Sequence, residues 1–352
     1  MLPMGAGPAC PSQTARPAIP CRHVCCPLCG ADEAVPILLG RDRWHGLEGL
    51  FRVVRCLRCG GRYQDPQPIP EALHLCYPAD YQAYRPSGRG RQRAENARLD
   101  RQVRRRIAEA VLCRCRGYPG HAPWWAWLAW PLTGLSRHND RLIPYRAPGR
   151  LLDVGCGSGG YLDRMRSLGW QVTGLEPDEK AARTAREALG LNVLTGELSC
   201  VDLPAGGFDA VTFWHVLEHL PEPRAALERA RRLLRPGGLL VAQVPNAEGC
   251  CARIFGPDWM GLDLPRHLTH FSPRTLRRLL GQVGFRVLGV RQERLADGWK
   301  WSVRWRWPRA RWLQRRKRLW RFVADLTALL GMADCVTALA ERPGRPPREA
   351  SP

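Results

Sequence analysis

The sequence contains no apolar run close to the roughly 18–20 residues that a membrane-spanning helix needs. Its first twenty residues are rich in Pro and Ala but hold no continuous apolar stretch, so a secretory signal is not expected. Acidic residues are scarce: 32 Asp and Glu stand against 54 Lys and Arg, for a formal net charge of +22. These shortages argue against a membrane span and against secretion, and they favour acidic partners.

At 352 residues, the chain is long enough for one substantial core and a smaller domain. We expect disordered tails at 1–20 and 344–352, and the first of these could precede the true start of translation. Fifteen cysteines would suit disulfides. However, two C-x-x-C pairs and a cofactor-like loop indicate a reducing compartment, so we expect a cytoplasmic protein.

The most informative stretch is residues 151–161, which read Leu-Leu-Asp-Val-Gly-Cys-Gly-Ser-Gly-Gly-Tyr. It predicts a buried strand, then a glycine turn, then the start of a helix. Glycine has no Cβ and adopts positive φ, so such a turn lets the backbone touch a ligand. The helix that follows offers unpaired N–H groups and a positive dipole end. This stretch therefore predicts a site for a nucleoside-bearing cofactor.

Two cofactors fit the glycine spacing. Gly155, Gly157 and Gly160 satisfy the dinucleotide pattern G-x-G-x-x-G, which holds a pyrophosphate. Gly155, Gly157 and Gly159, preceded by Asp153, instead match the loop that binds S-adenosylmethionine. A carboxylate at the strand tip would repel a pyrophosphate but attract the ammonium and sulfonium of the methyl donor. Asp153 therefore favours S-adenosylmethionine over NAD.

Three later segments support a nucleoside site. Residues 171–177 predict a second strand that ends at Glu176, near the ~20-residue offset of a ribose-binding carboxylate. Residues 208–220 predict a strand that runs into a short helix. Residues 234–241 predict a helix stop, a turn and a buried strand.

Four motifs in order, LDVGCGSG, GLEPD, FDAVTFWHVLEH and LRPGGLLV, resemble those of the class I S-adenosylmethionine-dependent methyltransferases. The chain is most similar to a bacterial branch with a WHVLEH segment and a later DLPRHLTHFSP segment, which here spans residues 263–273. The resemblance covers about residues 148–292. Members of this branch often begin with a small cysteine-rich module, and their substrates are frequently unassigned, so the resemblance implies the reaction but not the acceptor.

The predicted core is an α/β, doubly wound, Rossmann-like sheet that is mostly parallel, because strands alternate with helices. The resemblance implies seven strands, the last of which (in 334–343) inserts antiparallel. Ligands of such a sheet bind at the carboxyl ends of its strands, where Asp153, Glu176 and residues 214–219 fall. We expect strands near 151–154, 171–175, 192–195, 208–213, 238–244 and 285–290, and helices near 159–168, 178–189, 222–234 and 272–283.

The N-terminal residues 21–80 carry two zinc-knuckle patterns. Cys26 and Cys29 form one pair, Cys56 and Cys59 the other, and each pair is followed by a glycine that permits the tight bend. Four thiolates would close a tetrahedral structural zinc site with no open position for catalysis. A hairpin at 34–55 would span the gap between the pairs. Cys25 is an alternative to Cys26, the alternative to a metal site is four unrelated thiols, and His23 is expected to be a bystander.

Two regions are basic and rich in tryptophan. Residues 81–147 predict a helical linker or lid, with apolar spacing over 98–112 and four tryptophans within 123–131. Residues 293–333 predict a helical insertion before the last strand, in which tryptophans alternate with arginines. For this insertion, contact with a membrane surface and a helical hairpin packed on the core are both open.

The resemblance also implies cofactor contacts. Asp153 and Gly155 would approach the amino-acid moiety, and Gly157 would allow close backbone approach. Glu176 would accept hydrogen bonds from the ribose, and the turn at Glu197 would border the adenine. The full predicted set of cofactor-binding residues is Asp153, Gly155, Cys156, Gly157, Glu176, Pro177, Glu197, Leu198, Trp214 and His215.

Methyl transfer requires an aligned acceptor and the exclusion of water, and a hydroxyl acceptor also needs a base, for which histidine is suited. His215 and His219 stand one helical turn apart. The resemblance places His215 beside the adenosyl group or acceptor, and His267 and His270 on a loop over the acceptor. For each of these histidines, the alternative to a catalytic role is that of an ordinary structural histidine with a hydrogen-bonded ring. We therefore predict acceptor contact by His267 or His270, with His215 as a further catalytic candidate.

The sequence thus predicts a methyltransferase that uses S-adenosylmethionine and carries structural Zn²⁺. Its acceptor is expected to be a small, sugar or lipid-linked acidic molecule, methylated on oxygen rather than on nitrogen or carbon. Peripheral contact with the inner membrane face is a further expectation. The alternatives are an NAD-dependent sugar-nucleotide enzyme and an RNA-binding or RNA-modifying zinc protein. Nucleic acid is less favoured, because residues 213–216 lack the Asn/Asp-Pro-Pro-aromatic clamp of base N-methylation.

Overall fold

The computed structural model describes residues 19–77, 116–118 and 141–344. The predicted helix at 98–112, the tryptophan cluster at 123–131 and nearly all of both tails lie outside these residues. Among the described residues, no helix is both long and apolar enough to span a bilayer.

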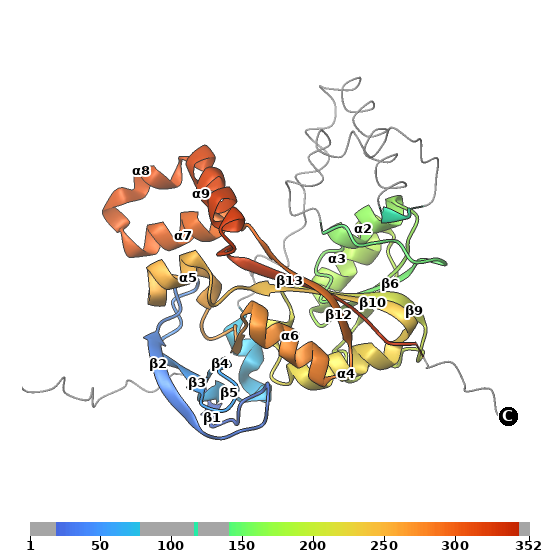
Figure 1. Ribbon diagram of the computed structural model, residues 1–352, viewed down its shortest axis with the longest axis horizontal. Helices are drawn as coiled ribbons and strands as arrows, with labels where there is room; N and C mark the ends of the chain where they lie inside the picture. The colour runs from blue at the N-terminus through green and yellow to red at the C-terminus, as the bar shows by residue number, and fades with distance from the viewer. Residues whose placement is uncertain (1–18, 78–115, 119–140, 345–352) are drawn as a thin grey trace, which may run out of the picture.

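The core is a seven-stranded sheet in the order β12-β13-β10-β9-β6-β7-β8 (Figure 1). All neighbouring pairs are parallel except those of β13, which runs antiparallel to both β10 and β12. The predicted fold class is therefore confirmed, including its antiparallel last strand. The strands are β6 (Arg150–Val154), β7 (Gln171–Glu176), β8 (Val193–Thr195), β9 (Phe208–Trp214), β10 (Leu234–Pro245), β12 (Arg286–Glu293) and β13 (Cys335–Glu341).

Helices cover both faces of this sheet, as a doubly wound fold requires. Figure 1 shows α2 (Gly160–Ser167) and α3 (Glu179–Leu189) on one face, and α4 (Pro223–Leu233) and α6 (Pro273–Gln282) on the other. The start of α6 follows from the sequence, because the Ser272 side chain accepts from Thr275 N, Thr275 accepts from Ser272 N, and Pro273 occupies the first turn.

One strand begins earlier than the expected residue 238. Helix α4 ends at Leu233 and β10 starts at Leu234, with an irregularity in its pairing to β9 between Leu234 and Leu239. Gly237 has a φ of 77° within this irregularity. The expected helix stop and turn therefore form a bulge inside one long strand.

The N-terminal residues build a second sheet, β11-β4-β3-β2. Strands β2 (Ala34–Gly40) and β3 (Phe51–Cys56) form the predicted hairpin between the cysteine pairs, and β4 (Arg62–Gln64) follows. Its last member, β11 (Thr269–His270), comes from the segment that the sequence assigned to the core. Smaller elements complete this part of the chain: β1 (Cys21–Arg22), β5 (Gln67–Pro68) and the 3-10 helix η1 (Pro70–Cys76).

Module and core also share one hydrophobic cluster, in which Leu28 and Val54 pack with Phe271 and Leu279. The predicted boundary between 21–80 and 148–292 therefore does not separate two independent cores. The physical reason is that a 3-residue strand such as β4 buries little apolar surface by itself, and the core segment supplies what it lacks.

The predicted insertion at 293–333 is helical. It comprises α7 (Ala296–Arg306), η8 (Pro308–Ala310), α8 (Arg311–Gln314) and α9 (Lys317–Leu329). Its inner tryptophans, Trp299 and Trp320, pack with Phe255 in a second cluster. The predicted helical hairpin that packs on the core is therefore present. Contact of its outer face with a membrane stays a prediction. The segment before it contains α5 (Cys250–Phe255) and the 3-10 helices η6 (Gly256–Asp258) and η7 (Met260–Leu262).

Candidate active site

Asp153 lies where the predicted cofactor loop leaves β6. Its side chain is buried and accepts a hydrogen bond of 2.6 Å from Thr212 Oγ1. Burial raises the pKa of this carboxyl to about 7, because no other charge close by fully compensates for lost water. A cation placed beside it would favour the ionised form. Asp153 is therefore suited to a cationic ligand and poorly suited to an anionic one.

The three loop glycines all have positive φ: 70° at Gly155, 55° at Gly157 and 81° at Gly159. A Cβ on Gly155 would lie 2.6 Å from Val216, and one on Gly159 would lie 2.5 Å from Leu191. Glycine is required here both for its conformation and for the close packing of the loop. Helix α2 begins directly after Gly159 and points its N-terminus to this loop.

Glu176 closes the other side of the loop from the end of β7. Its carboxylate is buried and accepts from Gly157 N at 2.7 Å and from Asp178 N at 3.1 Å. Burial raises its pKa, and the two backbone donors partly oppose that rise. Glu176 therefore contacts the glycine loop directly, at the position expected for a carboxylate that binds ribose. Among the other predicted contacts, Cys156, Leu198 and Trp214 are buried, and Glu197 and Pro177 are exposed.

Two further residues border this site that sequence reasoning did not select. The guanidinium of Arg141 lies 5.3 Å from the centre of the Trp214 ring, and its charge opposes the rise in the pKa of Asp153. The ring of Tyr161 meets the Trp214 ring edge-on at 5.3 Å. Arg141 lies in the predicted linker at 81–147 but outside its periodic stretch and its tryptophan cluster, so no periodicity or motif could identify it.

The end of β9 brings a carboxylate and histidines together. Glu218, in the 3-10 helix η5 (Leu217–His219), is 1% exposed, and its Oε1 lies 3.2 Å from His215 Nδ1. Burial alone would raise the pKa of Glu218, but the contact with His215 and the charges of the neighbouring histidines leave it lowered. Its Oε2 has no hydrogen-bond partner among the described residues. That buried oxygen therefore keeps an unused acceptor site for a hydrogen bond.

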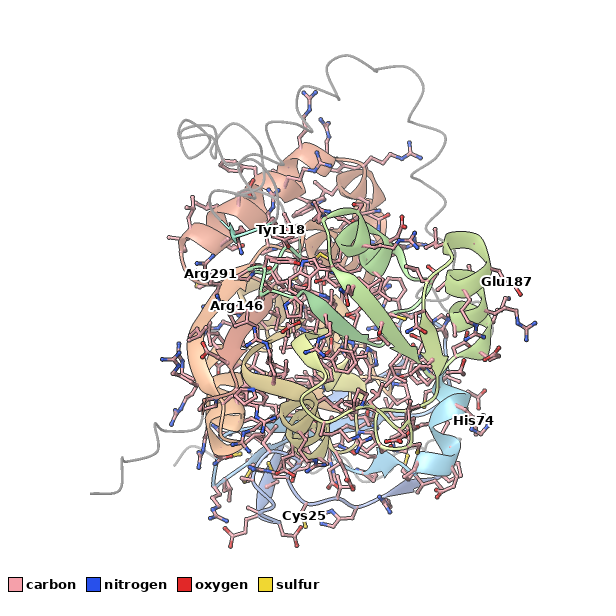
Figure 2. The ribbon with its side chains drawn as sticks, turned by 90° about the vertical axis from the view of Figure 1, so that its right-hand side faces the viewer. Cys25, His74, Tyr118, Arg146, Glu187 and Arg291 are labelled. Atoms are coloured by element: carbon pink, nitrogen blue, oxygen red, sulfur yellow. The ribbon has the colours of Figure 1, made fainter. Side chains whose placement is uncertain are left out.

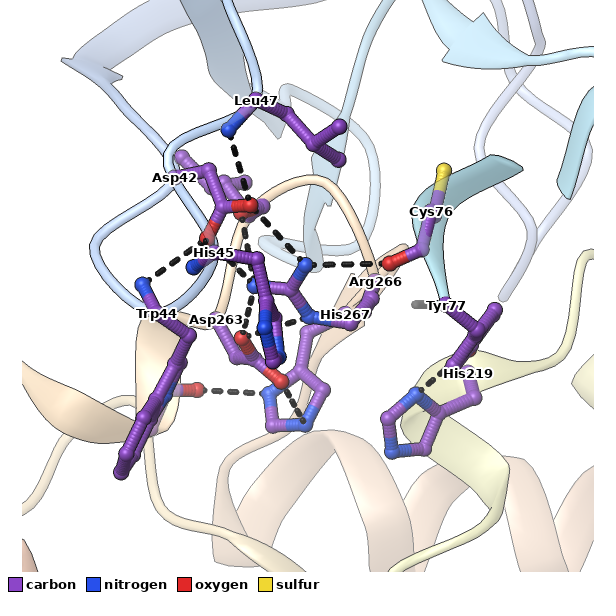
Figure 3. A network of polar contacts seen from close by, with 12 residues as sticks. Asp42, Trp44, His45, Leu47, Cys76, Tyr77, His219, Asp263, Arg266 and His267 are labelled. Carbon is purple, nitrogen blue, oxygen red and sulfur yellow. Dashed lines mark hydrogen bonds and ion pairs between the residues drawn. The ribbon is translucent and has the colours of Figure 1, made fainter. Parts of the chain in front are cut away.

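His219 and His267 face one another beside Glu218. Their ring centres are 4.6 Å apart, and His219 Nδ1 lies 3.0 Å from the Tyr77 hydroxyl (Figure 3). Burial, followed by the charge of His267, lowers the pKa of His219 to about 4. Ligand atoms of Glu218, His219 and His267 all lie within 4.8 Å of one another, a grouping that could hold a divalent cation or share a proton.

The partners of His267 determine which tautomer its neutral ring adopts. Nδ1 lies 2.8 Å from the Gly261 carbonyl, which can only accept, so Nδ1 carries the proton in the neutral ring. Nε2 then presents a lone pair, 3.8 Å from Asp263 Oδ2. His267 is therefore oriented as a base.

A buried ion network holds the segment that carries His267 (Figure 3). The Arg266 side chain is fully buried and contacts Asp42 at 2.6 Å and Asp263 at 2.6 Å. It also donates to the Cys76 carbonyl at 3.1 Å. Because Asp42 and Cys76 belong to the N-terminal module, this module fixes the histidine segment of the core.

The other predicted catalytic histidines lie differently. His215 has a φ of 58° and a side chain that is 25% exposed, so it is partly accessible to solvent beside Glu218. His270 lies in β11 rather than on a loop, is 4% exposed, and has a pKa lowered to about 3 by burial and by His267. Its burial inside the second sheet favours a structural role, and acceptor contact by any of these histidines stays a prediction.

The four predicted metal ligands converge. The Sγ atoms of Cys26 and Cys59 are 3.5 Å apart, those of Cys29 and Cys56 are 3.6 Å apart, and all four lie within 4.8 Å of one another. A tetrahedron with Zn–S bonds of about 2.3 Å has edges of roughly 3.8 Å, so the donor set fits zinc. Cys25 is exposed at the surface (Figure 2).

The glycines after the two pairs have the expected function. Gly30 and Gly60 have φ of 73° and 74° and donate to Cys26 O and Cys56 O. His23 contacts Asp32 and Asp65 instead of the thiols.

Comparison with known proteins places these features in one family. A family model described as a methyltransferase domain matches residues 133–290. A ubiquinone biosynthesis O-methyltransferase of Thiobacillus denitrificans is 31% identical over 169 residues, which is 44% of this chain and 73% of that protein. Its counterpart in Xanthomonas euvesicatoria is 35% identical over 183 residues, or 46% of this chain and 77% of that protein. A solved structure of a SAM-dependent methyltransferase from Archaeoglobus fulgidus is 21% identical, aligned over 62% of this chain and all of that one with a TM-score of 0.42.

Proposed function

This chain belongs to the class I S-adenosylmethionine-dependent methyltransferases, and from that premise we propose that it methylates a hydroxyl oxygen of a small or lipid-linked acceptor. The observation that carries the proposal is the pairing of a cofactor loop with a properly oriented base. The end of β6 lies between the ends of β9 and β7, and His267 presents Nε2 beside Glu218, which follows β9. The names of the two relatives, both O-methyltransferases, support oxygen as the acceptor atom.

The donor, when bound, supplies a methyl group on a sulfonium, which is already activated. In this proposal Asp153 attracts its cationic end, Gly155 and Gly157 allow backbone approach, and Glu176 accepts from its ribose hydroxyls. The protein then has to place the acceptor in line with the carbon–sulfur bond and keep water out. These roles are the cofactor contacts predicted from the sequence, and the positions of the four residues around the loop support them.

The acceptor step uses His267. An acceptor oxygen forms the new bond to the methyl carbon while the carbon–sulfur bond breaks and its electron pair stays on sulfur. The hydroxyl proton passes to His267 Nε2, and the Gly261 carbonyl stabilises the Nδ1–H of the resulting imidazolium. Arg266 is a positioning residue in this scheme, because it acts through Asp263 on the histidine segment.

Direct titration tests the proposal against its main rival. Isothermal titration with S-adenosylhomocysteine should show one tight site, and titration with NAD should show none. Incubation with methyl-labelled donor and a cell lysate should then label a small or lipid fraction through a methyl–oxygen bond. Tight NAD binding without S-adenosylhomocysteine binding would contradict the donor, and labelling on nitrogen or carbon would contradict the acceptor atom.

We further propose that Cys26, Cys29, Cys56 and Cys59 bind one structural Zn²⁺ ion. The distances among their sulfur atoms and the two glycine bends support it. Metal analysis of the purified protein should give about one zinc per chain. Cys26→Ser should lower that content, whereas Cys25→Ser, its neighbour on the surface, should leave it unchanged. Equal zinc content in both variants would contradict this ligand set.

A further inference from the structure

Helix α9 has two apolar faces, and only one of them is packed. Trp320, Ala324 and Thr327 are buried, and the Trp320 ring stacks on Trp299 of α7 with ring centres 6.2 Å apart. The second face consists of large side chains that remain in solvent: Leu319 (42% exposed), Phe322 (64%), Leu326 (44%), Leu329 (85%) and, just after the helix, Leu330 (61%). We name these five residues the outer stripe.

The outer stripe is one continuous surface. Its members follow the spacing i, i+3, i+7, i+10 and i+11, which places them on one side of a helix. Their exposure shows that no described residue covers them. Contiguous exposed apolar surface is uncommon on soluble proteins and marks a contact site. The stripe therefore requires a partner that accepts apolar side chains.

The surroundings of the stripe are positively charged. Arg318 and Arg321 are exposed on α9, and Arg315 and Arg316 are exposed just before it. The acid on this helix, Asp325, is paired with Arg294 and adds no free negative charge. The partner must therefore hold negative charge as well as apolar groups.

Two exposed tryptophans belong to the same helical segment. Trp307 is 47% exposed and Trp312, in α8, is 61% exposed. Figure 1 shows α7, α8 and α9 as a lobe that projects beyond the seven-stranded sheet, so its outer side is accessible. Arginine and tryptophan beside an apolar stripe are typical of helices that lie in a membrane interface.

We propose that the outer stripe of α9 binds the surface of an anionic lipid bilayer. Leucine and phenylalanine side chains enter the acyl boundary, and the flanking arginines contact lipid phosphates. A second copy of the chain is disfavoured as occupant, because each copy carries a net charge of +22 and the two basic surfaces would repel one another. A nucleic acid would match the arginines but leave the leucines and Phe322 in water.

Flotation of the full-length protein with vesicles tests this proposal without any acceptor or donor. The protein should float with phosphatidylcholine vesicles that contain phosphatidylglycerol, and much less with pure phosphatidylcholine vesicles. Binding should weaken at high ionic strength, because salt screens the arginines. Absence of binding to anionic vesicles at low ionic strength would overturn the proposal.

Matched variants distinguish vesicle binding through the outer stripe from binding through the overall positive charge of the protein. Phe322→Glu with Leu329→Glu should abolish flotation, whereas Leu75→Glu, at a leucine of η1 that is 50% exposed, should leave it intact. Arg318→Ser and Arg321→Ser should each weaken binding roughly fivefold. Unchanged thermal melting and unchanged S-adenosylhomocysteine binding would show that these variants are folded. Equal flotation of the stripe variant and the wild type would refute the assignment. It would also be refuted if the wild type formed a dimer that the stripe substitutions dissociate and did not bind vesicles.

Discussion

The raised pKa of Asp153 makes donor binding depend on pH. In the free protein this carboxyl has a pKa of about 7, because burial raises the pKa more than the hydrogen bond from Thr212 lowers it. A bound cation favours the ionised form and lowers that pKa, so binding releases a proton. Affinity should therefore increase as the pH rises toward 7 and level off above it, where the free carboxyl is already ionised. The α-amino group of the donor remains protonated through most of this range.

The size of the effect follows from linkage. For a pKa of about 7 that falls below the measured range on binding, affinity for S-adenosylmethionine should rise roughly 15-fold between about pH 5.5 and pH 7. Isothermal titration in buffers of different ionisation enthalpy would give both the affinity and the number of protons released. Asp153→Asn keeps the shape and the contact with Thr212 but removes the charge, so it should flatten the dependence.

A matched buried carboxyl provides the control. Burial also raises the pKa of Asp334 to about 7, and that residue lies directly before β13, outside the predicted cofactor contacts. Asp334→Asn should therefore retain the full pH dependence. An affinity that does not vary with pH in the wild type, or an unchanged slope in Asp153→Asn, would refute the electrostatic argument.

Four further outcomes are expected. His267→Ala should lower kcat about 10²–10⁴-fold with little change in donor affinity, measured by single-turnover methyl transfer; His270→Ala should instead lower thermal stability. Arg266→Met should lower kcat and stability together, because it leaves the carboxylates of Asp42 and Asp263 unpaired, at a cost of roughly 3–5 kcal/mol in the free energy of unfolding. Gly159→Ala should weaken S-adenosylhomocysteine binding, because its Cβ would meet Leu191 at 2.5 Å and φ is 81°. Chelation of zinc should lower the melting temperature and expose thiols to titration; retention of both properties after metal removal would argue against a structural ion.

Local signals in the sequence predicted much of the fold. The strands that carry Asp153 and Glu176 near their ends, and the glycine loop between them, follow from short patterns, because a buried strand and a tight turn each involve only a few neighbouring residues. The start of α6 follows from Ser272 and Pro273 in the same way. The convergence of the cysteine pairs also follows, because each C-x-x-C bend is local and the predicted hairpin fills the gap between them.

Short patterns could not predict the contacts between segments that are far apart in the sequence. The pair Arg266–Asp42 joins residues 224 positions apart, and Tyr77 meets His219 across 142 positions. Strand β11 has two residues, too few for any alternation, so its place in the second sheet could not be recognised. The pairing of β11 with β4 buries His270 in a strand, whereas the resemblance placed it on a loop over the acceptor.

A crystal structure with S-adenosylhomocysteine bound tests the central claim most directly. It should show the ribose hydroxyls within hydrogen-bonding distance of Glu176 and the ammonium group beside Asp153, with the backbone of Gly155 and Gly157 against the ligand. A diphosphate seated on this loop, or a ligand that lies away from both carboxylates, would contradict the account.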